Sequence, residues 1–413
     1  MLFLNCINRC LRQAIQHKCK NLKCNVIIQK ILDVQKNFHR SKCNTKRNKN
    51  KGGKTTTSGT KSGKKLVAME EVIRFIKDCF IASCVPEDHA CIMAKTLAAC
   101  DYRGIMSHGM NRVEMYINML KTNALDGCVK PVIKCETPAT AWVDGKNGLG
   151  AVIAHFCMEL AMGKAEEVGI GFVVAQHSNH YIVPGLYNLK AMEKGYIGIN
   201  MSNTWPLMAP KGAKEPILGT NPISIGAPGA DDHYLFDVAT TQVAVGKLEV
   251  ASRKGPTIPA GWALDKDGKP TTDVKKALEA KLLLPLGGID FGYKGYGLAG
   301  AIDILTGVLG DSDFSKNIVF KEGVPMNLGQ NFLVINPNMF APDFKERLTC
   351  FNQTLRSCKV DNEKNKLMIP GDTEIQRMKE VVKAGGIEYT ENQLQACEKL
   401  SKELDVEPLQ FVC

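Results

Sequence analysis

The stretch "KGYGLAGAID", Lys294–Asp303, contains Gly-Tyr-Gly-Leu-Ala-Gly and therefore matches the pattern G-x-G-x-x-G. In a Rossmann turn, a strand leads directly into the first glycine and the cofactor pyrophosphate lies on the N-terminus of the following helix. The residues before Gly295 read "LLPLGGIDFGY", in which a proline and three glycines predict a loop. The match is therefore weak evidence for a Rossmann turn, and the rest of the chain has to explain these glycines.

The positive charge is concentrated at one end of the 413-residue chain, whose net charge is +11. Residues 1–65 hold 17 Lys and Arg and a single acid, Asp33, which leaves a mildly acidic body. Such a body argues against a globular surface that binds the phosphate backbone of nucleic acid. We expect residues 1–65 to form a basic, disordered tail and residues 66–413 to form the functional body, with its cofactor-binding part at about 140–320.

The basic tail has three readings that the sequence leaves open. Its amphipathic, acid-poor start fits a mitochondrial transit peptide, although it holds few Arg and no run of Ser. It could equally be a disordered extension, or a segment upstream of the true start. The chain shows no secretory signal and no run of 18 apolar residues, so we expect a cytoplasmic or mitochondrial protein without a membrane span. The 16 cysteines form no C-x-x-C, which indicates reduced thiols and no zinc site.

The body reads as helices first and then as mixed strands and helices. Residues 68–85, 86–104 and about 110–121 have helical patterns, and a helix is also expected at 151–168. Strands are expected around 140–145, 169–178, 196–204, 221–229, 234–240 and 331–340, with a last helix at 391–404. The order lacks the regular strand–helix alternation of a doubly wound sheet, so we predict an α/β fold with a mixed sheet and an N-terminal helical segment.

The segment "DYRGIMSHGMNRVEMY" is the first candidate site. His108 and Arg112 are four residues apart and would share one face of a helix if the helix had begun. The planar guanidinium of arginine binds a carboxylate through two bonds, so an Arg beside a His suits a small acid substrate. On spacing alone, a helix N-terminus capped by Ser107, with Arg112 exposed, is the favoured explanation of the segment.

The segment "AQHSNHYIVPGLY" is the second candidate site, because it ends a predicted strand in polar residues. His177 and His180 are placed where α/β proteins usually bind ligands, and histidine transfers protons near neutral pH. A spacing of H-x-x-H could be half of a metal site, but no cluster of carboxylates accompanies it, so we predict no metal. A purely structural role remains open for His177 more than for His180.

Two further segments offer ligand contacts. The turn Gly219–Pro222, which includes Thr220, can orient a ligand or simply join two strands. Lys294 stands among glycines that permit close backbone approach, so it could reach a phosphate or a ribose, or be a solvated lysine in a mobile loop.

Taken in order, these segments resemble the malate/L-lactate dehydrogenase family of the second, non-Rossmann type. The resemblance covers about Leu66 to Gln410 and rests on "DYRGIMSHGMNR", "SNHYIVPGLY", "MAPKGAKEPILGTNPISIGAP", "FDVATTQVAVGK", "IPAGWALDKDGKPTTD", "LPLGGIDFGYKGYGL" and "IPGD". It implies a homodimer that uses NAD or NADP in a fold unrelated to Rossmann domains, with its sites near the subunit interface. On this reading the glycines around Lys294 belong to a cofactor loop.

The resemblance also implies roles for individual residues. His108 and His180 are the two candidates for the proton-transferring histidine, and the sequence does not rank them. Arg112 would bind the substrate carboxylate, assisted by Ser107 and Thr220. The implied cofactor contacts are Thr204, Asp237, Val238, Ala239, Lys294, Gly371, Asp372 and Thr373.

The sequence departs from the family pattern at two places. Tyr181–Gly185 reads Tyr-Ile-Val-Pro-Gly where the family often shows Phe-Gly-Ala-Ala-Gly, and Lys211–Ala213 replaces a common Trp-Gly-Gly. These changes concern the substrate and the level of activity. We therefore predict an oxidoreductase that transfers a hydride between a nicotinamide and a small 2-hydroxy acid, malate-like or lactate-like. The alternatives are a cyclic ketimine reductase and a cofactor-binding pseudoenzyme.

Overall fold

A seven-stranded mixed sheet organises the part of the chain that the structure describes. The structure is a computed structural model, and it describes residues 65–210, 212–362 and 367–412. The strand order is β2-β3-β4-β11-β5-β6-β7, in which β3 and β4 are parallel and the other neighbours are antiparallel. The predicted mixed α/β fold is confirmed, and the sheet differs from the parallel sheet of a Rossmann domain. The strands are β2 (Val132–Glu136), β3 (Thr140–Asp144), β4 (Ile170–Ser178), β5 (Ile197–Ser202), β6 (Ile223–Pro228), β7 (His233–Val238) and β11 (Leu328–Ile335).

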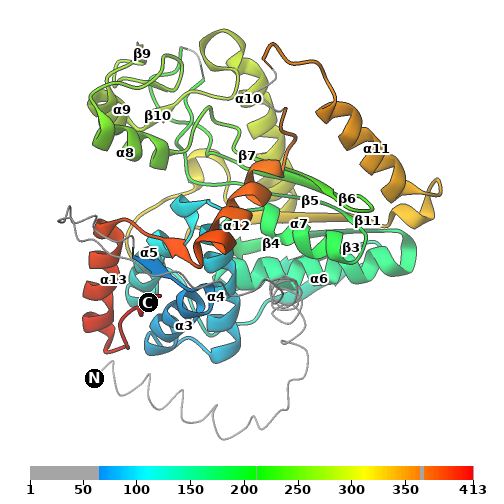
Figure 1. The fold of residues 1–413 in the computed structure, drawn as a ribbon, viewed down its shortest axis with the longest axis horizontal. Coiled ribbons are helices and arrows are strands. Elements are labelled where there is room, and N and C mark those ends of the chain that lie inside the picture. Colours follow the sequence, from blue (N-terminus) through cyan, green and yellow to red (C-terminus); the bar gives the residue numbers. More distant parts are fainter. Residues whose placement is uncertain (1–64, 211, 363–366, 413) are drawn as a thin grey trace, which may run out of the picture. The chain divides into compact units, whose positions relative to one another are not determined.

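Different helical segments cover the two faces of this sheet. Along β11, Phe332 and Val334 are buried in the cluster formed with α6 (Gly150–Val168), whereas Asn331 donates a hydrogen bond to the carbonyl oxygen of Leu305. Because side chains alternate between the two faces of a strand, α6 and the segment around Leu305 lie on opposite faces. Helix α7 (Gly185–Glu193) packs on β5 and β6, and Figure 1 shows it on the same side of the sheet as α6.

A helical cluster built from the start and the end of the described chain forms the largest apolar core. Helix α3 (Met69–Ala82) buries Val72, Phe75, Ile76, Cys79 and Phe80, which is the predicted helical periodicity. This face packs in one core with residues of α4 (Glu87–Tyr102), α5 (Val113–Lys121) and α13 (Glu391–Leu404). Residues near the ends of β4 and β11 join the same core, so the cluster lies against one end of the sheet.

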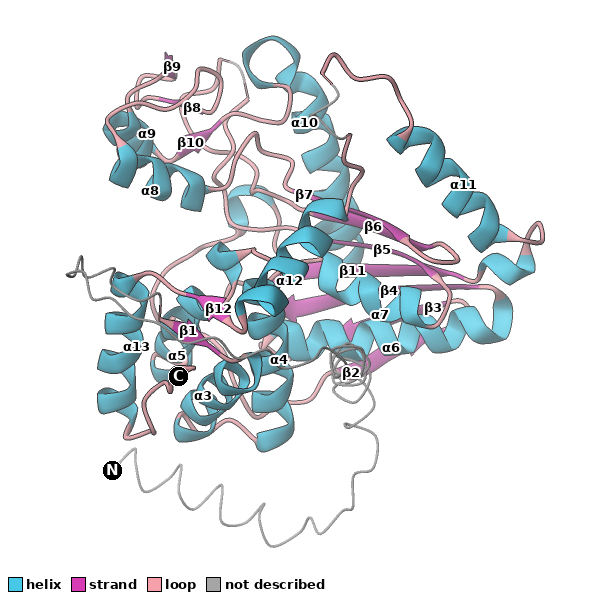
Figure 2. Cartoon of the chain, viewed as in Figure 1, coloured by secondary structure: helices cyan, strands magenta, loops and turns pink. Residues whose placement is uncertain are grey.

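The remaining elements form smaller units. Figure 2 shows a three-stranded sheet of very short strands, in the order β10-β8-β9, close to two helices. These elements share a small apolar core that includes the fully buried side chains of Leu248 and Leu283. The bounds are β1 (Leu66–Val67), β8 (Ala263–Leu264), β9 (Pro270–Thr271), β10 (Leu282–Leu283), β12 (Ile387–Glu388), α8 (Val245–Lys254), α9 (Val274–Ala280), α11 (Phe344–Arg356) and α12 (Asp372–Ala384).

The glycine-rich stretch around Lys294 is a helix, so the predicted loop was wrong. Helix α10 spans Gly288–Asp303 and continues as a π-helix, η3 (Ile304–Val308). Packing requires glycine at position 295, because a Cβ on Gly295 would lie 2.4 Å from the backbone nitrogen of Leu286. A Cβ on Gly297 or Gly300 would meet nothing within 4 Å. The match to G-x-G-x-x-G is therefore a coincidence in the middle of a helix.

The predictions for the basic tail, residues 1–64, lie outside the described residues. Within residues 65–210, 212–362 and 367–412, no helix combines the length and the apolar character needed to cross a membrane.

Candidate functional site

The Ser-His-Gly segment folds as two short 3₁₀ turns, η1 (Met106–His108) and η2 (Met110–Arg112). Gly109, with φ −100° and ψ −130°, separates the turns, so His108 and Arg112 do not lie on one continuous helix as the spacing suggested. They are brought together by hydrogen bonds instead. Arg112 Nε donates to the carbonyl oxygen of Ser107 (2.8 Å), and Ser107 Oγ is 2.9 Å from His108 Nδ1.

A buried carboxylate holds this segment in place. Asp101, at the end of α4, accepts hydrogen bonds from the Met110 backbone N–H (2.8 Å) and from the Tyr389 hydroxyl (2.7 Å). A Cβ on Gly109 would lie 1.9 Å from Asp101 Oδ1, so only glycine permits this approach. Burial raises the pKa of Asp101 to about 7. The sequence reading missed Asp101 and Tyr389, because they meet only in the folded chain.

The second motif places His180 next to the first. The His108 and His180 rings stack with their centres 5.8 Å apart and their planes inclined by 20°. Tyr116 Oη lies 2.6 Å from His180 Nδ1 and donates to the His180 carbonyl oxygen at 3.2 Å. The Trp205 ring centre lies 6.4 Å from that of His180. The structure therefore joins both candidate histidines in one cluster.

Tyr116 was not singled out from the sequence, although it ends the segment "DYRGIMSHGMNRVEMY". It lies on α5, one helical turn after Arg112, and its side chain is fully buried. Burial also raises the pKa of Tyr116, so its hydroxyl stays protonated at neutral pH. A fully buried tyrosine needs a partner for its hydroxyl, and that requirement was the signal available in the sequence.

Both histidines of the cluster are neutral at physiological pH. Burial, and next the Arg112 charge, lower the pKa of His108 to about 4. Burial, and next the charges of His108 and Arg112, lower the pKa of His180 to about 3. The terminal nitrogens of Arg112 form no hydrogen bond with any described residue, so they are open to a carboxylate. The cluster therefore combines a fixed cation with two neutral imidazoles, which can accept protons.

Thr204 and Thr220 form a hydrogen-bonded pair beside this cluster. Thr220 N–H donates to Thr204 Oγ1 (2.8 Å), and Asn221 Oδ1 accepts from Thr204 N–H (3.0 Å). Thr204 directly precedes Trp205, whose ring contacts that of His180. The turn at 219–222 thus fixes two of the predicted ligand-binding residues at the edge of the histidine cluster.

Asp237 connects the end of β7 to the segment that follows His180. Its Oδ2 accepts a hydrogen bond from the Gly185 N–H (2.8 Å) at the start of α7. A Cβ on Gly185 would lie 2.4 Å from that oxygen, and burial raises the pKa of Asp237 to about 7. Val238 and Ala239 follow it on the chain. The departing residues of the Tyr181–Gly185 segment follow His180 directly. Among them, Ile182 is buried in the helical core with φ +77°.

The turn Gly371–Thr373 opens α12 and docks on the same strand. The Leu235 N–H donates to the Pro370 carbonyl oxygen (3.1 Å), two residues before Asp237. Asp372 is already paired, because Arg356 donates two hydrogen bonds to its carboxylate. The structure thus places the 371–373 turn beside β7.

Lys294 is placed differently from the other predicted cofactor residues. It is exposed on α10, with its Nζ 5.3 Å from the centre of the Phe291 ring and 5.9 Å from that of Tyr293. The structure gives it no contact with the residues around His180. The lysine therefore stands on a helical surface and not in a loop that closes over a ligand.

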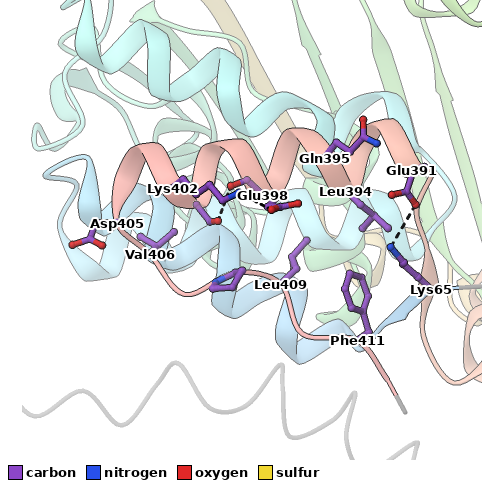
Figure 3. A pocket seen from close by; sticks show the side chains of 12 residues that line it. Lys65, Glu391, Leu394, Gln395, Glu398, Lys402, Asp405, Val406, Leu409 and Phe411 are labelled. Atoms are coloured by element: carbon purple, nitrogen blue, oxygen red, sulfur yellow. Dashed lines mark hydrogen bonds and ion pairs between the residues drawn. The ribbon is translucent and has the colours of Figure 1, made fainter.

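A surface pocket lies apart from this cluster. Figure 3 shows it between α13 and the C-terminal segment, where Leu394, Leu409 and Phe411 are flanked by the ion pair Lys65–Glu391. None of the predicted site residues lines it. Among the residues that the structure describes, no three His, Cys, Asp or Glu side chains are grouped as they would be around a metal ion.

Comparisons with known proteins find relatives over most of the chain. A family model described as malate/L-lactate dehydrogenase matches residues 67–398. A malate dehydrogenase of Pyrococcus horikoshii is 38% identical over 348 residues, which cover 83% of this chain and 96% of that protein. An L-sulfolactate dehydrogenase of Methanocaldococcus jannaschii is 40% identical over 327 residues, which cover 78% and 92% respectively.

Two further matches extend the comparison. A solved structure of malate dehydrogenase from P. horikoshii has a TM-score of 0.77 and 35% identity, and the match covers 86% of this chain and 99% of that chain. A Delta(1)-pyrroline-2-carboxylate/Delta(1)-piperideine-2-carboxylate reductase of Pseudomonas syringae pv. tomato is 29% identical over 276 residues, 66% of this chain and 79% of that protein.

Proposed function

This chain belongs to the malate/L-lactate dehydrogenase family, and on that premise we propose that it oxidises and reduces a small 2-hydroxy acid and its 2-oxo form. The cofactor is NAD or NADP, which accepts or supplies the hydride when bound. The observation that carries the proposal is the cluster of His108, His180 and Arg112, two neutral imidazoles beside a guanidinium with free terminal nitrogens.

Arg112 is proposed to bind the substrate carboxylate. Its Nε is engaged with the Ser107 carbonyl oxygen, which fixes the plane of the guanidinium. The two terminal nitrogens can then hold both oxygens of one carboxylate, an arrangement that a lysine cannot reproduce. Ser107 and Thr220 are proposed to line the same substrate site.

His180 is proposed to be the proton acceptor during oxidation. The Tyr116 hydroxyl has one proton, and the His180 carbonyl oxygen, 3.2 Å away, can only accept it. The hydroxyl oxygen can then accept from His180 Nδ1–H across the 2.6 Å contact, which leaves Nε2 unprotonated. With a pKa of about 3 the ring is neutral, so Nε2 is available as a base at physiological pH. His108 would hydrogen-bond the substrate oxygen.

We propose that a nicotinamide dinucleotide binds along β7. Gly371 has φ +101°, and a Cβ there would lie 3.3 Å from His233 Nε2 and 3.4 Å from Leu235 Cβ, so glycine lets this turn pack closely against β7. We propose that this turn, with Asp372 and Thr373, holds the cofactor. Contacts from Thr204, Asp237, Val238 and Ala239 would then direct its nicotinamide end toward His180.

We also propose that the chain acts as a homodimer. Helix α10, η3 and the segment that follows expose many large apolar side chains, more than a single solvated helix face requires. Lys294 lies on this surface, so its proposed cofactor contact would be made near the subunit interface. The exposed side chains are Phe291, Tyr293, Tyr296, Leu298, Ile304, Leu305, Val308, Leu309, Phe314, Val319 and Phe320.

The dimer is tested by sedimentation of two variants. Val308→Glu, on the proposed surface, should convert the protein to a monomer. Val382→Glu, at a similarly exposed site on α12, should leave the dimer intact. If both variants sediment with the same mass as the parent, this surface is not the dimer interface.

Reduction of a cyclic imino acid is the second candidate function, because the reductase from P. syringae is a relative. The same Arg112 clamp would serve either substrate. A protonated cyclic imine needs no proton from the enzyme at the reacting atom, whereas a 2-oxo acid does. The Tyr116–His180 pair can exchange that proton with the substrate oxygen, so the presence of the pair favours the hydroxy acid.

A substrate panel tests the function. Purified full-length protein is given malate, lactate and sulfolactate with NAD or NADP, and piperideine-2-carboxylate with the reduced cofactors. We expect turnover with a 2-hydroxy acid. Turnover with the imine alone would make the chain a ketimine reductase, and cofactor binding without any turnover would make it a pseudoenzyme.

A further inference from the structure

Two exposed cysteines lie side by side on the helical cluster, although 44 positions separate them in the chain. Cys84 lies in the turn between α3 and α4, and Cys128 lies in the segment that follows α5. The Cys128 Sγ donates a hydrogen bond to the Cys84 carbonyl oxygen at 3.3 Å. The fold therefore places one thiol directly against the backbone of the residue that carries the other.

The two segments that carry these cysteines are held together by contacts of their neighbours. A Cβ on Gly127 would lie 2.8 Å from Val85 Cγ2, so glycine is what lets the two segments approach this closely. The Gly127 carbonyl oxygen lies 2.8 Å from His89 Nδ1, which is a buried hydrogen bond. Lys130 Nζ lies 3.7 Å from the Asp88 carboxylate. The short separation of Cys84 and Cys128 is thus fixed independently of the cysteines themselves.

This arrangement suits a disulfide bond. Bonded cysteines have their Cα atoms about 4.4–6.8 Å apart, so the two backbones must already be neighbours. The Cys84 carbonyl carbon and Cβ are attached to the same Cα, and the Cys128 sulfur is within hydrogen-bond distance of that carbonyl. Rotation about χ1 moves the Cys84 sulfur among its staggered positions and can bring it to the Cys128 sulfur without a shift of the backbone.

The segment between the two cysteines carries the candidate site. It contains α4, η1, η2 and α5, and therefore His108, Arg112 and Tyr116. A bond between its ends would close this segment into a loop, which restricts the unfolded chain and stabilises the folded state. The same bond would keep the two ends together when this region opens locally.

We propose that Cys84 and Cys128 form a reversible disulfide that holds together the two ends of this segment. The scattered cysteines indicated reduced thiols, and this pair is the exception that the fold creates. The inference does not depend on the proposed function, because the bond needs neither substrate nor cofactor.

A peroxide is the oxidant that the reaction requires. One cysteine attacks the O–O bond of hydrogen peroxide as its thiolate, so that its sulfur becomes a sulfenic acid and water leaves. The second thiol attacks the sulfenic sulfur, the S–S bond forms, and a second water leaves. Two thiols thus give two electrons to one peroxide molecule. A dithiol reduces the bond again by thiol–disulfide exchange.

Peptide mapping tests whether the bond forms. Full-length protein is reduced, freed of reductant, treated with one equivalent of hydrogen peroxide, alkylated and digested with trypsin. We expect peptides 78–95 and 122–134 to be linked, with two hydrogens fewer than their summed mass, and the link to disappear with dithiothreitol. Cys84→Ser and Cys128→Ser should each abolish it.

Cys91→Ser is the matched control, because Cys91 lies on α4 in the same tryptic peptide as Cys84. This variant should keep the link. A link that Cys91→Ser abolishes, or one that appears on a non-reducing gel only at the mass of two chains, would overturn the assignment of the pair.

Thermal unfolding tests the effect of the bond on the segment. The peroxide-treated parent should melt about 5 °C or more above the reduced parent. The Cys84→Ser and Cys128→Ser variants should fold and melt at one temperature with or without peroxide. Parent thiols at both positions that remain fully alkylated after peroxide, or a linked parent without a higher melting temperature, would overturn the inference.

Discussion

Replacing Tyr116 by phenylalanine tests how His180 is positioned. The change removes one oxygen atom and keeps the buried ring that packs in the helical core. His180 Nδ1 then loses the partner at 2.6 Å, and the ring loses the contact that fixes its tautomer. We expect kcat for oxidation of the hydroxy acid to fall, because fewer molecules present an unprotonated Nε2 to the substrate.

The size of the effect follows from the burial of the pair. A buried donor left without a partner costs about 1–3 kcal/mol. Because about 1.4 kcal/mol corresponds to tenfold in rate, kcat/KM should fall by about fivefold to about a hundredfold. The affinity for the reduced cofactor should stay the same, since Tyr116 contacts His180 and not the proposed cofactor turn.

Steady-state kinetics over a range of pH, with calorimetry for the cofactor, measures both quantities. Tyr187→Phe is the matched control, because the Tyr187 hydroxyl is equally buried and donates a 2.6 Å hydrogen bond to the Tyr181 carbonyl oxygen. The control should lose stability but little of kcat. If the two variants lose kcat equally, or if Tyr116→Phe keeps the parent rate, the positioning role is refuted.

Four further outcomes are expected. Arg112→Lys should lower kcat/KM for the acid at least about tenfold with cofactor affinity unchanged, because misplacement by about 1 Å can cost on the order of a hundredfold; parent-like kinetics would place the clamp elsewhere. Because burial lowers the pKa of His180 to about 3, kcat/KM for oxidation should not decline as pH falls through 6.5 in a pH–rate profile, and a midpoint near 6.5 would contradict this. Burial raises the pKa of Asp101 from 3.8 to about 7, so the contribution of its protonated form to stability is lost as pH rises through about 7. Denaturant unfolding should therefore show that Asp101→Asn becomes more stable relative to the parent between pH 4 and pH 8. A difference in unfolding free energy that does not change with pH would argue against the raised pKa. A protein that starts at Lys65 should keep the parent's kcat/KM and melting temperature, and a fall in either would make residues 1–64 part of the catalytic unit.

The sequence predicted those elements whose own pattern decides their structure. Strand β4 and helix α3 have clear periodicities, and both formed as expected. Helix α10 was missed because isolated glycines disfavour helices by about 1 kcal/mol each. In the folded chain, the close approach of Leu286 to Gly295 requires glycine, so tertiary packing overrides the local preference. No local pattern carries that information.

The residues of the candidate site also fall into two groups, those found from the sequence and those brought together only by the fold. His108, Arg112 and His180 lie in short motifs with distinctive composition, and these were found from the sequence. Asp101 and Tyr389 are 288 residues apart and meet only through the packing of α4 against the C-terminal part of the chain. The burial of Arg103 beside Met378, with Nη2 unpartnered among the described residues, is likewise a property of the folded structure.

The most direct test is the rate of nicotinamide reduction by the parent and by His180→Gln with the best 2-hydroxy acid from the panel. Loss of general base catalysis is worth about 10²–10⁴-fold, so the variant should be slower by at least about a hundredfold while binding NADH as tightly as the parent. A parent that reduces neither NAD nor NADP with any 2-hydroxy acid, or a His180→Gln variant that matches the parent rate, would contradict hydride transfer at this cluster.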